Sequence, residues 1–469
     1  MAFDLSIRNI GKLTDAQLSI GQFTVFAGPN NTGKSYVSRL LYSLFDAMNA
    51  NHALVHLSNM VNPVQSDLDS LKNSLDLADY DHEDLPLPVF YREISAMVDL
   101  MKSCPTDNVQ EIQQRLPVLI QATQNMKEAY QVLEPNIRKL EMPKAGLVQW
   151  AWLENSLTGL GNHLNDLYEK VSKAEAKEFV LSGITYKIRQ NLTQNFQVAN
   201  LLDLRREPES DSSLEIDDLG IFVTFDDSNA ISFDIDPAGL RKLQEYSRVL
   251  YLESPVYWKL KAALERAQRF PRFFHMLERE RLSGVPGYFY DLASALLEEY
   301  TGDMAFPDLY KELTGETRMA GKITISENGE LSFRENGRHF SLPVTAMGVI
   351  NLGILALLIE RKILDKGAFL FVDEPEAHLH PSWQVVMAES LFTLAKGGVK
   401  VVIATHSADI LKWLEVHVKK NPDDKSLVAL NQFPVVGNAS NEQDFEDKMA
   451  TLKQELTRPF SDLYLEGLL

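Results

Sequence analysis

The residues with the clearest chemical potential lie near the amino terminus and form a phosphate-binding loop. They are Gly28, Pro29, Asn30, Asn31, Thr32, Gly33, Lys34 and Ser35, in that order. The pattern G-x-x-x-x-G-K-S/T needs its glycines because they permit backbone angles that turn amide N–H groups towards phosphate oxygens. Lys34 is expected to reach the β- and γ-phosphates of a nucleotide, and the Ser35 hydroxyl is expected to bind Mg²⁺.

The segments on either side of the loop fit the same interpretation. Residues 23–27 (FTVFA) predict a buried strand, and residues 36–45 predict a helix whose amino terminus adds partial positive charge. Tyr36 begins this helix and belongs to the predicted nucleotide-binding set. The alternative interpretation is a glycine-rich turn that carries a surface lysine.

A bound nucleotide also needs a carboxylate for its metal and a base for its water, and both occur far downstream. Residues 368–375 (AFLFVDEP) predict a central strand that is buried on both faces and ends in two acids. Asp373 is expected to hold Mg²⁺, directly or through water, and Glu374 to polarise the attacking water. The alternative is an ordinary acidic loop after a strand.

A third polar group follows the next predicted strand. Residues 401–407 (VVIATHS) place His406 at the carboxyl end of a buried strand, the edge at which open α/β sheets bind ligands. We expect His406 to reach the γ-phosphate region. The alternative is a loop histidine whose hydrogen bonds are satisfied locally.

Together these residues resemble an ABC-type ATPase of the SMC/RecF/OLD-like branch without a Toprim domain. Residues 3–12 are similar to the opening strand and turn of that branch, and 28–35 match its Walker A motif. Residues 373–381 (DEPEAHLHP) match its Walker B motif and D-loop, and 405–407 its switch histidine. The resemblance implies ATP and Mg²⁺ as ligands. It also implies an α/β P-loop head, with a mixed parallel core sheet and an antiparallel sheet.

The resemblance further implies that two heads bind ATP between them, each offering a signature segment to the other's Walker A motif. The corresponding place here is 343–348, where Met347 and Gly348 are expected to contact the neighbour's nucleotide. Ala346 stands where the branch has serine, so the hydroxyl expected at the γ-phosphate is missing unless Thr345 supplies it. Losing one hydrogen bond to a charged group slows a reaction by about ten- to a hundred-fold, so slow or regulatory ATP hydrolysis is expected.

Composition excludes several classes of protein. The 469 residues suffice for two or three domains, and 45% apolar with 24% charged residues is typical of a globular protein. The single cysteine, Cys104, and the lack of a signal-peptide pattern predict a cytoplasmic protein without membrane contact. The formal net charge of −19 argues against a protein that coats DNA, although it leaves room for a local basic groove.

The spacing of the motifs predicts a head interrupted by an insertion. Residues 1–45 and 206–469 are assigned to the ATPase head and 46–205 to a helical insertion, a short hairpin or bundle. A heptad seam runs along one helix, and it consists of Leu153, Leu157, Leu160, Leu164, Leu167 and Val171. Pro117 and Pro135 are expected to limit or kink another helix.

The segment after the insertion has three features of its own. Residues 206–218 predict an acidic linker, whereas 221–225 and 231–235 predict paired strands and 251–255 the end of another. Residues 323–326 and 331–334 flank Asn328-Gly329 and predict a β-hairpin, and all these strands are assigned to the antiparallel sheet. Basic residues interleaved with aromatic ones follow, namely Lys259, Lys261, Arg266, Arg269 and Arg272 with Phe270, Phe273, Phe274 and His275. They predict either a solvated helix face or a nucleic-acid contact.

The 63 residues after His406 contain no pattern of a metal-dependent nuclease. A head of this kind resembles the ATPase subunits of bacterial anti-phage systems, first the PtuA family of Septu and next the AriA family of PARIS. The resemblance implies a homo-oligomer that carries or restrains a separate nuclease effector, with nucleic acid contacted mainly through that partner. The alternative is a RecF- or SMC-like DNA-repair ATPase that acts directly on DNA.

Replacing Lys34 with alanine tests the phosphate-loop assignment. We expect Lys34→Ala to abolish ATP binding or the assembly that depends on it, because the ammonium that contacts the β- and γ-phosphates is lost. A titration with a fluorescent ATP analogue measures this, and an unchanged affinity would contradict the assignment.

Overall fold

The computed structural model describes residues 2–77, 84–103, 109–140, 147–207, 211–225, 231–253, 255–269, 282, 284–298, 301–326, 329–434, 439 and 444–466. The described residues form two compact units. The head unit lies within 1–49, 189–269 and 281–469, and the helical unit lies within 50–188. The sequence placed the insertion at 46–205. The helical unit is shorter at both ends, because the helix that ends at Met48 belongs to the head unit and the helix 176–196 is divided between the two units after residue 188.

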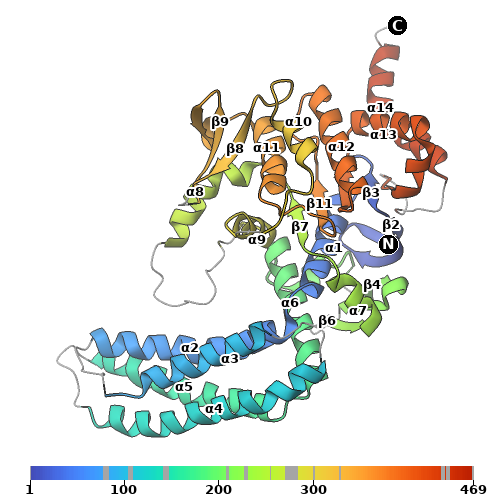
Figure 1. Ribbon diagram of the computed structural model, residues 1–469. Helices are drawn as coiled ribbons and strands as arrows, with labels where there is room; N and C mark the ends of the chain where they lie inside the picture. The colour runs from blue at the N-terminus through green and yellow to red at the C-terminus, as the bar shows by residue number, and fades with distance from the viewer. Residues whose placement is uncertain are drawn as a thin grey trace. The chain divides into compact units, whose positions relative to one another are not determined.

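The helical unit is a bundle of long helices (Figure 1). They are α2 (His52–Leu77), α3 (Leu87–Lys102), α4 (Val109–Arg138), α5 (Leu147–Ser172) and the first part of α6 (Ala176–Phe196). Helix α2 packs against α3 and α5, and α4 packs against the same two helices. The heptad seam of α5 is buried along its whole length, which makes it core.

Two prolines predicted to limit a helix do not end it. Pro117 and Pro135 both lie inside α4, which continues past each of them. A proline removes one backbone N–H and crowds the preceding turn, a cost of about 3 kcal/mol or more. Packing of α4 against α3 and α5 offsets this cost, because α4 buries Ile112, Leu116 and Leu133.

A parallel sheet forms the core of the head unit. Its order is β13 (Val428–Gln432), β3 (Phe23–Ala27), β12 (Lys400–Thr405), β11 (Phe369–Asp373) and β7 (Val249–Leu252). Helix α1 (Lys34–Met48) packs its Phe45 ring against Phe369, and α12 (Pro381–Lys396) packs Phe392 against Phe23. The register pairs Phe369 with Lys400 and Phe23 with Val401, so the two helices cover opposite faces.

The order of these strands positions the polar residues that follow them. Strand β12 lies between β3 and β11, with Ala27 opposite Thr405 and Asp373 opposite Ala404. The phosphate loop, His406 and Glu374 therefore leave neighbouring strands at one edge. This is the edge at which open α/β sheets bind ligands.

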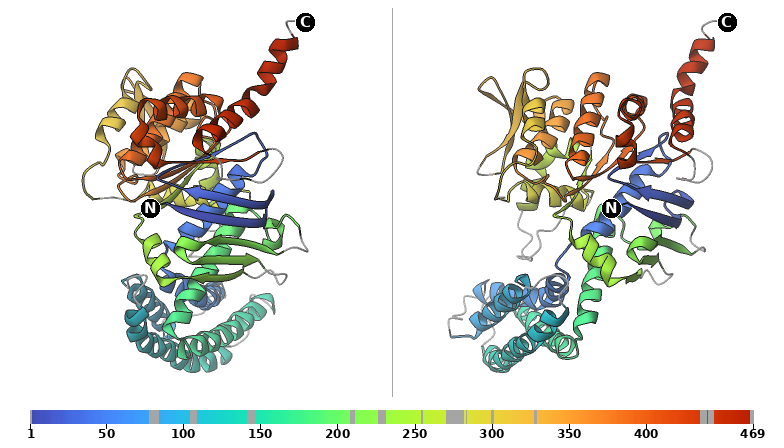
Figure 2. Two further views of the ribbon diagram at one scale, coloured as in Figure 1. Left: turned by 90° about the vertical axis from the view of Figure 1, so that its right-hand side faces the viewer. Right: turned by 45° about the vertical axis from the view of Figure 1, so that its right-hand side comes forward.

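The second sheet is antiparallel, in the order β2 (Leu13–Ile20), β1 (Phe3–Ile10), β4 (Ser212–Ile216), β5 (Ile221–Phe225) and β6 (Ile231–Ile235). Figure 2 shows its blue amino-terminal strands beside its green strands. Strand β4 corrects the linker predicted at 206–218. Leu214 and Ile216 alternate with polar residues and are fully buried, and Ser212 bonds Asn9. A period of two with so few apolar residues was too weak to stand out from an acidic segment.

Two further strand predictions assigned the strands to the wrong sheet. Strand β7 is the edge of the parallel sheet, and the predicted hairpin forms a separate sheet of β8 (Gly321–Ile325), β9 (Leu331–Glu335) and β10 (Arg338–Ser341). Alternation identifies a strand but not its partner. The predicted fold class, a mixed α/β head with a parallel core sheet and an antiparallel sheet, is confirmed.

Further helices complete the head unit: α7 (Pro237–Gln244), α8 (Val256–Arg269), α9 (Gly287–Ala295), α10 (Pro307–Thr314), α11 (Met347–Glu360), α13 (Ala408–Lys420) and α14 (Phe445–Glu466). Within the described residues, no helix combines the length and apolar character needed to cross a bilayer.

A glycine in α6 tests the packing of the helical unit. A Cβ at Gly183 would lie 2.2 Å from the His52 carbonyl oxygen of α2, so α6 would have to move. We expect Gly183→Ala to lower the unfolding free energy by about 1–2 kcal/mol, because overpacking outweighs the gain in helix propensity. Ser182→Ala, at the exposed preceding residue, is the control in thermal unfolding. Equal stability of the two variants would contradict the packing.

Candidate nucleotide-binding site

The phosphate loop has the backbone that its glycines predict. Gly33 has a φ of 99° and directly precedes α1, whose first residue is Lys34. A Cβ at Gly28 would lie 2.0 Å from the Phe433 carbonyl oxygen, so only glycine fits there. The amino terminus of a 15-residue helix therefore points at the loop and supplies unpaired N–H groups and partial positive charge.

The remaining loop residues are divided between exposed and anchored positions. Asn30 and Asn31 are exposed, and Asn31 Oδ1 accepts a hydrogen bond from Lys12. The Thr32 hydroxyl donates to the Pro29 carbonyl at 3.0 Å. Tyr36 donates from its hydroxyl to the Leu204 carbonyl at 2.9 Å. Tyr36 thus anchors α1, while the asparagines leave the loop open to a ligand.

Lys34 is buried among carboxylates. Its Nζ donates to the Pro29 carbonyl at 2.6 Å, and the residue is 6% exposed. Burial lowers the pKa of Lys34, while the charges of Asp373, Glu376 and Glu374 oppose that shift. An ammonium held in this way suits an anionic phosphate within the loop.

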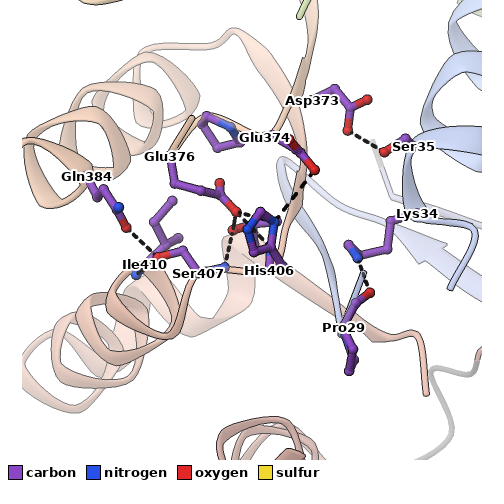
Figure 3. A network of polar contacts seen from close by, with 12 residues as sticks. Pro29, Lys34, Ser35, Asp373, Glu374, Glu376, Gln384, His406, Ser407 and Ile410 are labelled. Carbon is purple, nitrogen blue, oxygen red and sulfur yellow. Dashed lines mark hydrogen bonds and ion pairs between the residues drawn. The ribbon is translucent and has the colours of Figure 1, made fainter. Parts of the chain in front are cut away.

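Ser35 and Asp373 meet although 338 residues separate them. The Ser35 hydroxyl donates to Asp373 Oδ1 at 2.8 Å (Figure 3). Oxygen ligands of Mg²⁺ lie at about 2.0–2.1 Å from the ion, which puts adjacent oxygens of an octahedron about 2.9 Å apart. A hydroxyl and a carboxylate at this separation fit a magnesium site, where the ion would neutralise phosphate charge.

Burial makes the charged form of Asp373 unfavourable. The residue is 5% exposed, and burial raises its pKa to about 6, against the lowering effect of the Ser35 hydrogen bond. The Tyr251 hydroxyl donates to Asp373 Oδ2 at 3.2 Å. Because the folded carboxyl binds its proton more tightly than the unfolded one, the stability of the fold falls as the pH rises from about 4 to about 6, by up to roughly 3 kcal/mol.

The predicted base and the predicted switch histidine are neighbours. Glu374 follows β11 with a φ of 50°, a left-handed conformation that a non-glycine residue adopts at some cost. The His406 Nδ1 lies 3.7 Å from Glu374 Oε1 and 3.2 Å from Glu376 Oε1. The structure therefore brings together Lys34, Ser35, Asp373, Glu374 and His406, which can bind a metal–triphosphate and activate a water.

Met347 and Gly348 form the first turn of α11. Within the described residues, no recorded contact joins them to the phosphate loop, so their contact with a neighbour's nucleotide stays a prediction. The Thr345 hydroxyl donates to the Ser341 carbonyl at 3.0 Å and is engaged within its own chain. Ala346, the residue before α11, offers no hydroxyl.

Three sets of contacts near the site were not predicted from the sequence. Arg39, one turn of α1 beyond Ser35, pairs with Glu253 at 3.0 Å, directly after β7. Glu376 accepts hydrogen bonds from Thr405 and the His406 N–H. Asn351 of α11 bonds the turn after β11. Arg39 lies four residues after Ser35 on the same helix, and this spacing would have indicated that both face the site. Glu253 was missed because β7 was assigned to the wrong sheet.

The basic stretch at 259–272 is described only in part. Lys261 is 5% exposed and donates to the Gly329 carbonyl, and Lys259 donates to the Pro343 carbonyl. Both ammonium groups thus bond the chain's own backbone. The side chains of the remaining members lie outside the described residues. His380 accepts the Ser382 N–H at the start of α12, and the described residues contain no cluster of three or more metal-ligating side chains.

Comparison with known proteins indicates an ATPase. Residues 293–411 match the family described as an AAA ATPase domain. The chain is 52% identical over 45 residues to the protein named Old nuclease of Escherichia phage P2, a match that spans 10% of this chain and 8% of that protein.

Solved structures of SMC heads are also similar. The SMC head domain from Thermotoga maritima is 11% identical, with a TM-score of 0.31, and the match covers 94% of this chain and 97% of that one. An Smc head bound to the C-terminal winged-helix domain of ScpA is 10% identical, with a TM-score of 0.36 and coverages of 88% and 91%.

Replacing Asp373 with asparagine separates stability from function. We expect Asp373→Asn to raise the unfolding midpoint without ligand near pH 7.5, because a costly buried charge is removed. In the wild type we expect ATP to bind more tightly in Mg²⁺ than in EDTA. In Asp373→Asn the ratio of these two affinities is expected to be smaller by about tenfold or more. Asp409→Asn, on the exposed first turn of α13, is the control. An unchanged magnesium effect would contradict the metal assignment.

Proposed function

We propose that this chain is an ATP-binding and slowly hydrolysing subunit of a bacterial anti-phage defence complex. In this proposal it oligomerises through its ATPase heads and scaffolds or regulates a separate nuclease. The observation that carries the ATPase part is the Ser35–Asp373 contact, with Lys34, Glu374 and His406 at the same edge of the parallel sheet. The match to an AAA ATPase domain supports it.

Each residue has one role in the proposed reaction. The loop amides and Lys34 bind the phosphates, while Ser35 and Asp373 would hold Mg²⁺, which would offset charge on the phosphates. Glu374 orients the attacking water and accepts its proton, and His406 contacts the γ-phosphate. The missing hydroxyl at Ala346 supports slow turnover, and the engaged Thr345 hydroxyl supports it further.

Pairing of heads would complete the site. The exposed Asn30 and Asn31 leave the loop open on one side, and the amino terminus of α11 is the part of the chain proposed to close it on a second copy. ATP held between two heads would act as a reversible link between subunits, so that its hydrolysis releases them.

Two observations support a separate nuclease partner. The short match to a protein named a nuclease points to the same branch of ATPases, and the net charge of −19 favours indirect contact with nucleic acid. Co-purification from the native host, followed by mass spectrometry, tests this part. A bound nuclease is expected. Strong stimulation of ATP hydrolysis by DNA alone would favour direct action on DNA instead.

Replacing Glu374 with glutamine tests head pairing. We expect Glu374→Gln to retain bound ATP and to increase the oligomer fraction, because the nucleotide link forms but is not cleaved. Light scattering with and without ATP·Mg²⁺ measures this. The double variant Lys34→Ala/Glu374→Gln is the control and should not respond to ATP. The pairing proposal fails if oligomer size is independent of ATP in Glu374→Gln.

A further inference from the structure

Glu376 bonds the end of β12 and lies beside the imidazole of His406. Its Oε1 accepts hydrogen bonds from the Thr405 hydroxyl at 2.7 Å and the His406 backbone N–H at 2.8 Å. The His406 Nδ1 lies 3.2 Å from the same oxygen (Figure 3). One carboxylate oxygen thus accepts a hydrogen bond from the backbone of His406 and lies within ion-pair distance of its ring, whose Nδ1 has no hydrogen-bond partner among the described residues.

The charge of Glu376 exceeds what this local structure requires. The residue is 5% exposed, and within the described part of the chain its Oε2 has no hydrogen-bond partner. A neutral glutamine could accept both bonds to Thr405 and His406, at a lower cost of burial. A buried anion is therefore explained better by its effect on the adjacent imidazole than by the bonds to the strand end.

The turn that carries Glu376 is also bonded to α11. Asn351, which is 5% exposed, places its Nδ2 3.4 Å from the Pro375 carbonyl and 3.3 Å from the Ala377 carbonyl. A Cβ at Gly348 would lie 2.8 Å from the His378 carbonyl oxygen. Helix α11 therefore packs directly on the backbone on both sides of Glu376.

We propose that Glu376 is a positioning residue for ATP hydrolysis, and that Asn351 couples it to α11. Glu376 receives the Nδ1 side of the His406 ring, which leaves the opposite ring nitrogen for the γ-phosphate. A displacement of α11 moves residues 375–377 and, with them, Glu376 and the imidazole. The inference rests on the proposed function, and it adds a route by which events at α11 reach the chain's own catalytic edge.

The variant Glu376→Gln tests the positioning role. It keeps an oxygen for Thr405 and the His406 N–H but removes the charge beside the ring. We expect kcat for ATP to fall about tenfold or more, while the dissociation constant for a fluorescent ATP analogue changes less than about twofold. Glu389→Gln, the same change at an exposed position of α12, should leave both unchanged.

A double variant shows whether Glu376 acts through the ring. Glu376→Gln/His406→Ala should be no slower than His406→Ala, because the loss is shared. Additive losses would overturn the proposal, as would an unchanged kcat in Glu376→Gln. If ATP affinity and the unfolding midpoint fall together with kcat, the role of Glu376 is structural only, and this result would also overturn the proposal. Asn351→Ala is expected to lower kcat in the same direction.

The ring position gives a readout that does not depend on turnover. In a crystal structure of Glu376→Gln we expect His406 to leave its position beside residue 376, whereas an unmoved ring would overturn the inference. Wild-type protein that neither binds nor hydrolyses ATP would refute the proposed function, and this structure would still decide the role of Glu376.

Discussion

The hydrogen bond between Ser35 and Asp373 is the contact on which the rest of the site depends. It joins the start of α1 to the end of β11 across 338 residues of sequence. The contact exists because only β12 lies between β11 and β3, the strand that precedes the phosphate loop and α1. The same strand order places His406 between the phosphate loop and Glu374. The helical unit, inserted between α1 and the rest of the head, leaves this order intact.

The site concentrates charge that is unfavourable without a ligand. Lys34 and Asp373 are both buried, the pKa of Lys34 is lowered and that of Asp373 is raised, in each case chiefly by burial. A triphosphate supplies anions for the lysine, and Mg²⁺ supplies a cation for the carboxylate. Binding therefore relieves a cost that folding imposes, which is the usual relation between stability and function at such sites.

Local patterns in the sequence were enough to predict the elements that border the candidate site. The phosphate loop, the apolar strands before Asp373 and His406, and the leucine seam of α5 each depend on short-range spacing, and each lies where that spacing indicates. Long-range pairing could not be obtained in the same way. Strand β4 carries too few apolar residues to be recognised, and the sheet to which β7 belongs depends on partners far away in the chain.

The same limit explains the residues that were missed. Glu376 stands within a recognised motif, but only the fold shows that its carboxylate faces Thr405 and His406. Glu253 and Arg39 meet because β7 borders β11, and Asn351 matters because α11 packs on the turn after β11. Such contacts join elements that have no fixed separation in sequence, so spacing alone cannot indicate them.

The most direct measurement is a crystal structure of the chain with Mg²⁺ and a non-hydrolysable ATP analogue. The account predicts phosphates enclosed by residues 28–35, with the metal bound to the Ser35 hydroxyl and held, directly or through a water, by Asp373. A nucleotide bound at another surface, or a metal remote from Asp373, would contradict the central claim.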